Sequence, residues 1–167
     1  MDSYYDKLVI DHIEELGINC KVISDPSAIC AVINNKFPFQ GERIDFSRLK
    51  NNKFYQSADS NSLSSDTVGF IKTLLEEKRL DEEDTFIYVG DGLTENGYEL
   101  SVKELLRIIP SIIKDVPQHH YLITKDFKKI IFISFEYALE FGELYEENEV
   151  MKIIPSDDCK SRNTSIL

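Results

Sequence analysis

Apolar residues recur at helical spacing in the first part of the chain. Over residues 5–16 they follow the i, i+3, i+4, i+7 pattern of one helix face, and Gly17 supplies a C-terminal stop. A short strand is expected over residues 18–23. A second helix is predicted to begin at residues 25–26, where an aspartate can cap and a proline can open it, and to end near Phe37.

The next stretch shows no sustained periodicity. Residues 39–65 contain Gly41, repeated asparagine and six serines, so we expect an exposed connection with at most short structured pieces. A third helix is predicted to begin at Ser65 or Asp66. Its inward-facing residues would be Val68, Ile71, Leu74 and Leu75.

The middle of the chain combines a strand with a helix. Residues 85–89 are β-branched and aromatic, bounded by acidic residues and glycines, which predicts a strand. Ser101 and Glu104 have the spacing of a capping box, in which each side chain satisfies a free backbone amide at the start of a helix. Pro110 lies inside that helical pattern, so we expect a kink or a restart there.

Strand patterns dominate the end of the chain. Residues 120–124 and 130–135 are typical of an antiparallel hairpin, and 138–144 and 151–154 are further strand candidates. Helices come first and strands cluster later, without regular alternation. This order favours a single α+β domain over residues 1–155, with N-terminal helices packed on a mainly antiparallel sheet formed largely by the C-terminal half. Residues 156–167 are predicted to be a frayed tail.

Composition is typical of a cytoplasmic globular protein. The chain has 167 residues, of which 42% are apolar, enough for one core. Its start is acidic and has no apolar segment of a secretory signal, and the longest apolar run, residues 130–135, is far too short to cross a bilayer. Three cysteines with no metal-ligand spacing, Cys20, Cys30 and Cys159, indicate inert thiols in a reducing compartment.

Charge narrows the choice of partner. The formal net charge is −11, and residues 57–100 alone contain 11 acidic and 3 basic residues. Such a chain would be repelled by nucleic acid and by anionic membranes, so a cationic partner is favoured. A merely solvated, solubilising acidic surface is the alternative explanation.

Candidate catalytic and metal-binding residues are few. His119 and His120 could act as bases or ligands, but neighbours on a strand point to opposite faces, which favours a structural role. Asp91, Glu95 and Glu99 do not fit the calcium-loop spacing. No nucleophile–histidine constellation is identifiable, and we therefore expect no catalytic residue, metal or cofactor.

Four segments carry a resemblance to a known class of proteins. They read Phe86-Ile87-Tyr88-Val89-Gly90-Asp91, Gly97-Tyr98-Glu99-Leu100, Pro117-Gln118-His119-His120-Tyr121, and Phe135-Glu136 followed by Glu140-Phe141-Gly142. Together they resemble a pattern in the bacterial immunity proteins of contact-dependent growth inhibition and related polymorphic toxin systems. The resemblance implies a protein that binds one cognate toxin domain, often a nuclease, and blocks its active site. It implies no catalytic residues.

The acidic residues around the strand at 85–89 suggest where such a toxin would bind. If the turns at its two ends form one rim, their carboxylates would steer a basic nuclease, and a tyrosine would anchor it. The hypothetical contact surface comprises Asp81, Glu82, Glu83, Asp84, Tyr88, Asp91, Glu95, Tyr98 and Glu99.

Two other functions fit the sequence. One is a small cytoplasmic enzyme that uses His119 or His120 with Glu136 as the orienting carboxylate. The other is an α+β adaptor unrelated to toxins. The sequence predicts no oligomeric state.

Overall fold

The computed structural model describes residues 2–149, which fold around one seven-stranded antiparallel sheet. Its strands lie in the order β1-β6-β5-β7-β8-β9-β4. Their bounds are β1 Lys21–Ile23, β4 Lys50–Gln56, β5 Thr85–Gly90, β6 Gly97–Ser101, β7 His120–Thr124, β8 Lys129–Ile133 and β9 Ala138–Glu143. The edges of the sheet are therefore β1 and β4.

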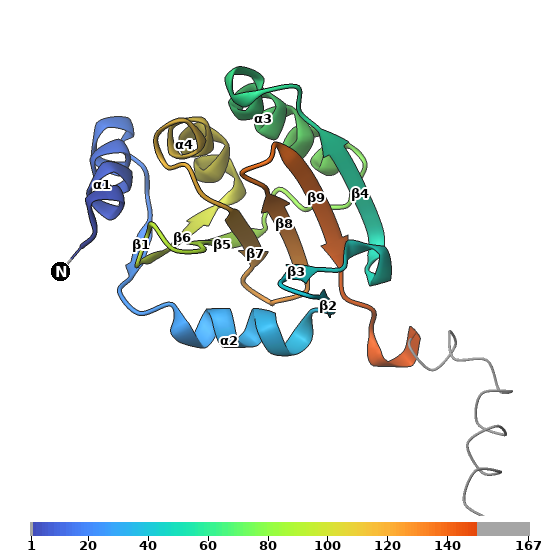
Figure 1. Cartoon of the computed structure of the whole chain (residues 1–167). Helices are drawn as coiled ribbons and strands as arrows, with labels where there is room; N and C mark the ends of the chain where they lie inside the picture. Colours follow the sequence, from blue (N-terminus) through green and yellow to red (C-terminus); the bar gives the residue numbers. More distant parts are fainter. Residues whose placement is uncertain (1, 150–167) are drawn as a thin grey trace, which may run out of the picture.

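Both faces of the sheet are covered (Figure 1). The helices α1 (Tyr4–Leu16), α4 (Val102–Asp115) and α3 (Ser60–Glu76) lie side by side on one face, with α4 in the middle. The opposite face carries α2 (Ser27–Lys36), the small hairpin of β2 (Phe39–Gln40) and β3 (Arg43–Ile44), and the 3-10 turn η1 (Phe46–Arg48). The helices therefore sandwich the sheet.

Alternation along β5 explains the two layers of core. Phe86 and Tyr88 pack into the cluster under α1, α3 and α4, whereas Ile87 and Val89 pack toward α2. Successive side chains of a strand point to opposite faces, so a central strand covered on both sides contains a continuous run of apolar residues. Burying each such side chain stabilises the fold by roughly 1.5–3 kcal/mol.

The predicted α+β class and several elements are confirmed. Gly17 ends α1 in a left-handed conformation with φ of 60°, the conformation that favours glycine. The hairpin of β7 and β8 pairs Tyr121 with Phe132, and β9 pairs with β8. Ser101 caps α4 by accepting a hydrogen bond from the Glu104 N–H at 3.2 Å, but the return bond of the predicted capping box is absent, because the Glu104 carboxylate accepts from Arg107 at 2.9 Å. The α4 helix continues through Pro110, so it does not restart there.

Most of residues 39–65 are exposed, as predicted, but the expectation of at most short structured pieces there is wrong. The connection contains β4, which pairs with β9 at the sheet edge, and it ends where α3 begins at Ser60, five residues before the predicted start. The Asp59 carboxylate caps α3 by accepting from the Ser62 N–H at 2.9 Å. The serines that suggested a loop therefore form the first turns of a helix, where short polar side chains are favoured.

Two predictions fall outside the described residues: the strand at 151–154 and the frayed tail at 156–167. The predicted domain boundary at residue 155 lies there as well.

Candidate interaction surface

The loop of residues 91–96, which joins β5 to β6, is held from below by a buried glutamine. Gln118 Oε1 accepts hydrogen bonds from the backbone N–H of Leu93 at 2.8 Å and of Thr94 at 3.4 Å. Its Nε2 donates to Thr94 Oγ1 and to the Tyr88 hydroxyl, both at 2.9 Å. One side chain from the α4–β7 connection thus fixes the middle of the loop.

The other end of the loop is held by Asp6 of α1, which is completely buried. Its carboxylate accepts from the backbone N–H of Glu95 at 2.8 Å and of Asn96 at 3.1 Å, and from the Tyr98 hydroxyl at 2.6 Å. Ser3 Oγ donates to the same carboxylate at 2.6 Å. A buried charge is tolerated when hydrogen bonds replace its lost hydration.

These hydrogen bonds set the charge state of Asp6. Burial alone would raise its pKa, but the hydrogen bonds from Ser3, Tyr98, Glu95 and Asn96 together lower the pKa below its usual value. Asp6 is therefore ionised at neutral pH, and its charge faces inward onto the backbone of the loop.

Further contacts complete the attachment of the loop. Ser3 Oγ lies 2.8 Å from the Leu93 carbonyl oxygen, and Asn96 Nδ2 donates to the Asp2 carboxylate at 2.9 Å. The first loop residue is fixed too, because Asp91 Oδ1 accepts from the His119 N–H at 3.2 Å. In Figure 1 the loop lies near the start of α1 and beside β1.

The network beneath the loop ends at His120. Its Nδ1 lies 2.9 Å from the Tyr88 hydroxyl. Burial, followed by the charge of His119, lowers the pKa of His120 to about 3, so its ring is neutral at physiological pH. Since Tyr88 accepts from Gln118, its own hydrogen is free to point at His120 Nδ1, and we infer that this nitrogen is the acceptor.

The side chains of Asp91 and Glu95, by contrast, are exposed. Glu95 makes no side-chain hydrogen bond or ion pair to any described residue. The loop thus combines a backbone fixed by buried groups with two carboxylates that face solvent. Preorganised groups lose little conformational entropy on binding, which makes such a loop suited to recognition.

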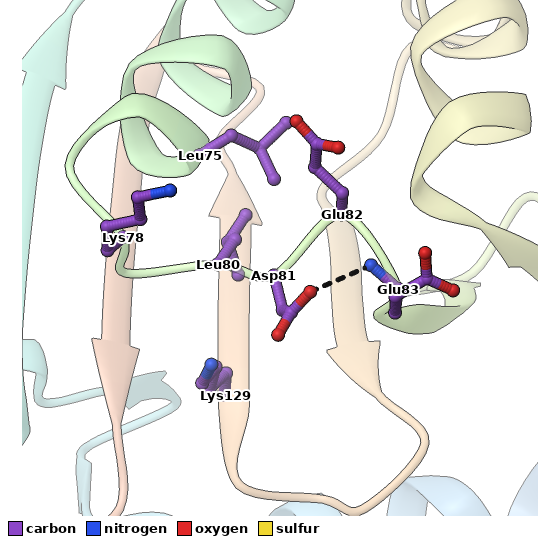
Figure 2. Close-up of a pocket in the computed structure, with 7 residues that line it drawn as sticks. All are labelled: Leu75, Lys78, Leu80, Asp81, Glu82, Glu83 and Lys129. Atoms are coloured by element: carbon purple, nitrogen blue, oxygen red, sulfur yellow. Dashed lines mark hydrogen bonds between the residues drawn. The ribbon is translucent and has the colours of Figure 1, made fainter.

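The second acidic segment, residues 81–84, is built differently. Asp81 accepts from the Glu83 N–H at 3.0 Å, and Asp84 accepts from the Asp81 N–H at 2.8 Å, so both carboxylates stabilise their own turn. Figure 2 shows this turn above Lys129 of β8, whose ammonium lies 3.8 Å from Asp84. An open hollow of about 400 Å³ lies here, lined by Leu75, Lys78, Leu80, Asp81, Glu82, Glu83 and Lys129. Lys78 and Lys129 thus offset part of the negative charge of residues 81–84.

The single acidic rim expected from the sequence is wrong. Residues 81–84 precede β5 whereas Asp91 and Glu95 follow it, so the two groups lie at opposite ends of a six-residue strand. Glu99 belongs to neither end. It pairs with Ile87 in the middle of the sheet, and its carboxylate is bound by Lys125 at 2.7 Å.

The proposed tyrosine anchors are also wrong. Tyr88 is 0% and Tyr98 is 1% exposed, and their rings stack on each other with centroids 5.9 Å apart. Both hydroxyls are used inside the protein, by His120 and by Asp6. They support the loop from within and do not reach a partner.

The residues of the catalytic alternative do not form a constellation. The ring of His120 lies under the helices beside Tyr88, whereas the ring of His119 packs on Phe132 at the opposite face. Glu136 pairs with Arg43 at 2.7 Å, and no hydrogen bond joins it to either histidine. Among residues 2–149 no group of three or more histidine, cysteine, aspartate or glutamate side chains could hold a metal ion.

Sequence reasoning missed the two residues that organise this surface. Gln118 lies in one of the segments that resemble immunity proteins, but nothing in its sequence neighbourhood assigns it a role. Asp6 follows Ser3 at capping-box spacing, and that signal predicts a helix start without indicating a buried charge.

Comparisons with known proteins identify no relative of this chain among family models or curated proteins. In the described part of the chain, no helix has both the length and the apolar character needed to span a bilayer.

Proposed function

We propose that this protein is an immunity protein that binds and neutralises a cognate bacterial toxin domain, a basic nuclease, with the loop of residues 91–96 in the contact. One observation carries the proposal. Asp91 and Glu95 are exposed on a loop whose backbone is held by the buried side chains of Asp6 and Gln118.

Electrostatics supports this choice of target. A nuclease needs a positively charged cleft to hold the phosphates of its substrate. Fixed carboxylates can occupy such a cleft in place of phosphates, and a net charge of −11 accelerates the encounter with a basic protein. The rigid loop would keep Asp91 and Glu95 in place when they lose their water.

The proposal includes a cytoplasmic location and no catalysis. A toxin nuclease finds its nucleic acid in the cytoplasm, so an inhibitor is useful there. Beneath the loop, His120 is hydrogen-bonded to the Tyr88 hydroxyl and Asp6 to the Tyr98 hydroxyl, which suits a scaffold better than a reacting centre.

The first test is binding and protection. The chain should co-purify with the toxin domain encoded beside it, and should restore growth to cells that express that toxin. It should also inhibit the purified nuclease at equimolar concentration. Absence of binding together with absence of protection would reject the proposed function.

The second test locates the contact. Asp91→Asn with Glu95→Gln should slow association with the toxin about tenfold at low salt, because steering by rigid charges acts on the association rate. The matched pair Glu82→Gln with Glu83→Gln removes the same charge at the other end of β5, and its association rate should change less than twofold. The reverse ranking would move the contact to residues 81–84.

A further inference from the structure

A small pocket opens beside the loop, on the face of the sheet that α2 covers. It has a volume of about 200 Å³, smaller than the cavities that usually hold a complete small-molecule ligand. Its lining residues come from α2, the β2–β3 hairpin, β5, the loop and β7: Cys30, Ile33, Asn34, Phe39, Glu42, Val89, Gly90, Asp91 and Tyr121. The size suits a single side chain of a partner.

The lining combines apolar walls with negative charge. Phe39 and Tyr121 contribute aromatic surface, and Ile33 and Val89 contribute aliphatic surface. Glu42 is exposed and makes no hydrogen bond or ion pair within residues 2–149.

Asp91 adds a second carboxylate to this pocket. Only its Oδ1 is hydrogen-bonded, to the His119 N–H at 3.2 Å. Asp91 and Tyr121 line the same pocket, and burial first, and then the charge of Asp91, raise the pKa of Tyr121.

Among residues 2–149, no lysine or arginine side chain lines this pocket. Arg43 is close enough to influence the pKa of Tyr121, but its guanidinium is bound by Glu136 at 2.7 Å. Glu42 and the free oxygen of Asp91 therefore retain their charge for an incoming group. A cation between them would gain two carboxylates and an aromatic face, while its aliphatic stem would cover apolar surface.

We propose that this pocket receives an arginine side chain of the protein partner. The planar guanidinium can stack on Tyr121 while it donates hydrogen bonds to Glu42 and Asp91. A lysine ammonium can also donate to carboxylates, but it has neither the flat surface for stacking nor the fixed fork of donors. This inference rests on the proposed function, because it names the group on the toxin that the surface beside the loop recognises. It also fits a partner whose cleft is rich in arginine for binding phosphate.

The test uses a probe that needs no toxin. The full-length ¹⁵N-labelled protein is titrated with N-acetyl-arginine methylamide and, separately, with its neutral isostere N-acetyl-citrulline methylamide, while amide chemical shifts are recorded. The arginine probe should shift amides of residues that line the pocket, and the citrulline probe should leave them in place. N-acetyl-lysine methylamide should bind at least about threefold more weakly than the arginine probe.

Two variants then distinguish binding of the arginine probe in the pocket from nonspecific attraction to the acidic surface. Glu42→Gln should weaken the arginine probe about threefold to fivefold, the range for one partly exposed ion pair. Glu14→Gln, a matched control on the exposed surface of α1, should leave the affinity unchanged. Because Glu42 makes no hydrogen bond or ion pair with residues 2–149, its substitution should not affect folding, which a thermal melt verifies.

Two results would overturn the inference: equal shifts with arginine and citrulline, or arginine shifts that Glu42→Gln does not weaken. Either outcome would leave the proposed function standing if the chain still protects against the toxin. If the native protein bound the arginine probe but did not bind the toxin, the proposed function would be rejected instead. The two failures are therefore distinguishable.

Discussion

The amide group of Gln118 occupies the space that a side chain at Gly90 would need. A β-carbon built on Gly90 would lie 1.9 Å from Gln118 Nε2 and 2.5 Å from Thr94 Oγ1. Gly90 has an ordinary backbone conformation, so its glycine is required by this close approach and not by its φ angle. Gly90, the residue before the loop, thus leaves the space that Gln118 needs to hold the loop.

Gly90→Ala should destabilise the protein by about 2–3 kcal/mol, because the added methyl displaces Gln118 from its hydrogen bonds. Urea denaturation measures the loss, and hydrogen exchange at Leu93 and Thr94 should accelerate by more than the global loss explains. Gly92→Ala is the control, since a β-carbon there meets nothing within 4 Å. An equal effect of both substitutions would contradict the claim that Gln118 holds the loop and requires glycine at position 90.

Asp6→Asn should cost about 3 kcal/mol, since it removes the buried charge that several donors face. The lowered pKa of Asp6 means that its contribution is present above about pH 4 and is lost as the pH falls further. The variant should therefore show a shallower loss of stability below pH 4 than the native protein. Asp11→Asn, on the exposed side of α1, should change stability by less than about 0.5 kcal/mol.

His120 makes stability depend on pH in a higher range. Its pKa is about 3 in the folded protein and near 6.5 when unfolded, so below about pH 6.5 the unfolded chain binds a proton that the folded chain refuses. Stability should fall by up to about 1.4 kcal/mol for each pH unit in this range. His120→Gln should flatten that slope.

Independent of any variant, NMR can follow the His120 ring itself. Its resonances should not titrate between pH 7 and pH 5. A midpoint near 6.5 would show that the ring is accessible and would contradict its buried, neutral state.

Tyr98→Phe should destabilise the protein by about 1.5–3 kcal/mol, the usual range for a hydrogen bond to a charged group. It removes the donor that lies 2.6 Å from Asp6, so the pKa of Asp6 should also rise toward its usual value. Tyr4→Phe is the control, because Tyr4 is 69% exposed. If Tyr98→Phe left stability unchanged but slowed toxin association, the tyrosine would be an anchor after all.

Local patterns were sufficient for the central strand β5 and failed at one edge of the sheet, the strand β4. Residues 85–89 are buried on both faces and contain the apolar run that such burial requires. Within residues 2–149 the edge strand β4 pairs with β9 alone, and its polar sequence from Lys50 to Gln56 is mostly exposed. Edge strands need no apolar face and are commonly protected by charged residues, so periodicity could not reveal it.

The candidate site depends on contacts that no local pattern contains. The Tyr98 hydroxyl reaches Asp6, 92 positions earlier in the chain, and Tyr88 reaches His120, 32 positions later. Their burial follows from how α1 and α4 pack on the sheet. The separation of the two acidic groups was accessible in principle, because the six residues of β5 span roughly 20 Å.

Gln118 and Asp6 accept hydrogen bonds from the main-chain N–H groups of residues 93–96 and make none with the exposed side chain of Glu95. The groups at positions 92 and 95 can therefore be exchanged for others while Asp6 and Gln118 continue to hold the same loop shape, whereas Asp91 also accepts a hydrogen bond from the His119 N–H. With the proposed function, substitutions at these exposed positions would be enough to change which toxin the protein binds. The main-chain N–H groups of the loop thus keep its shape, while exposed side chains such as Glu95 are available to a partner.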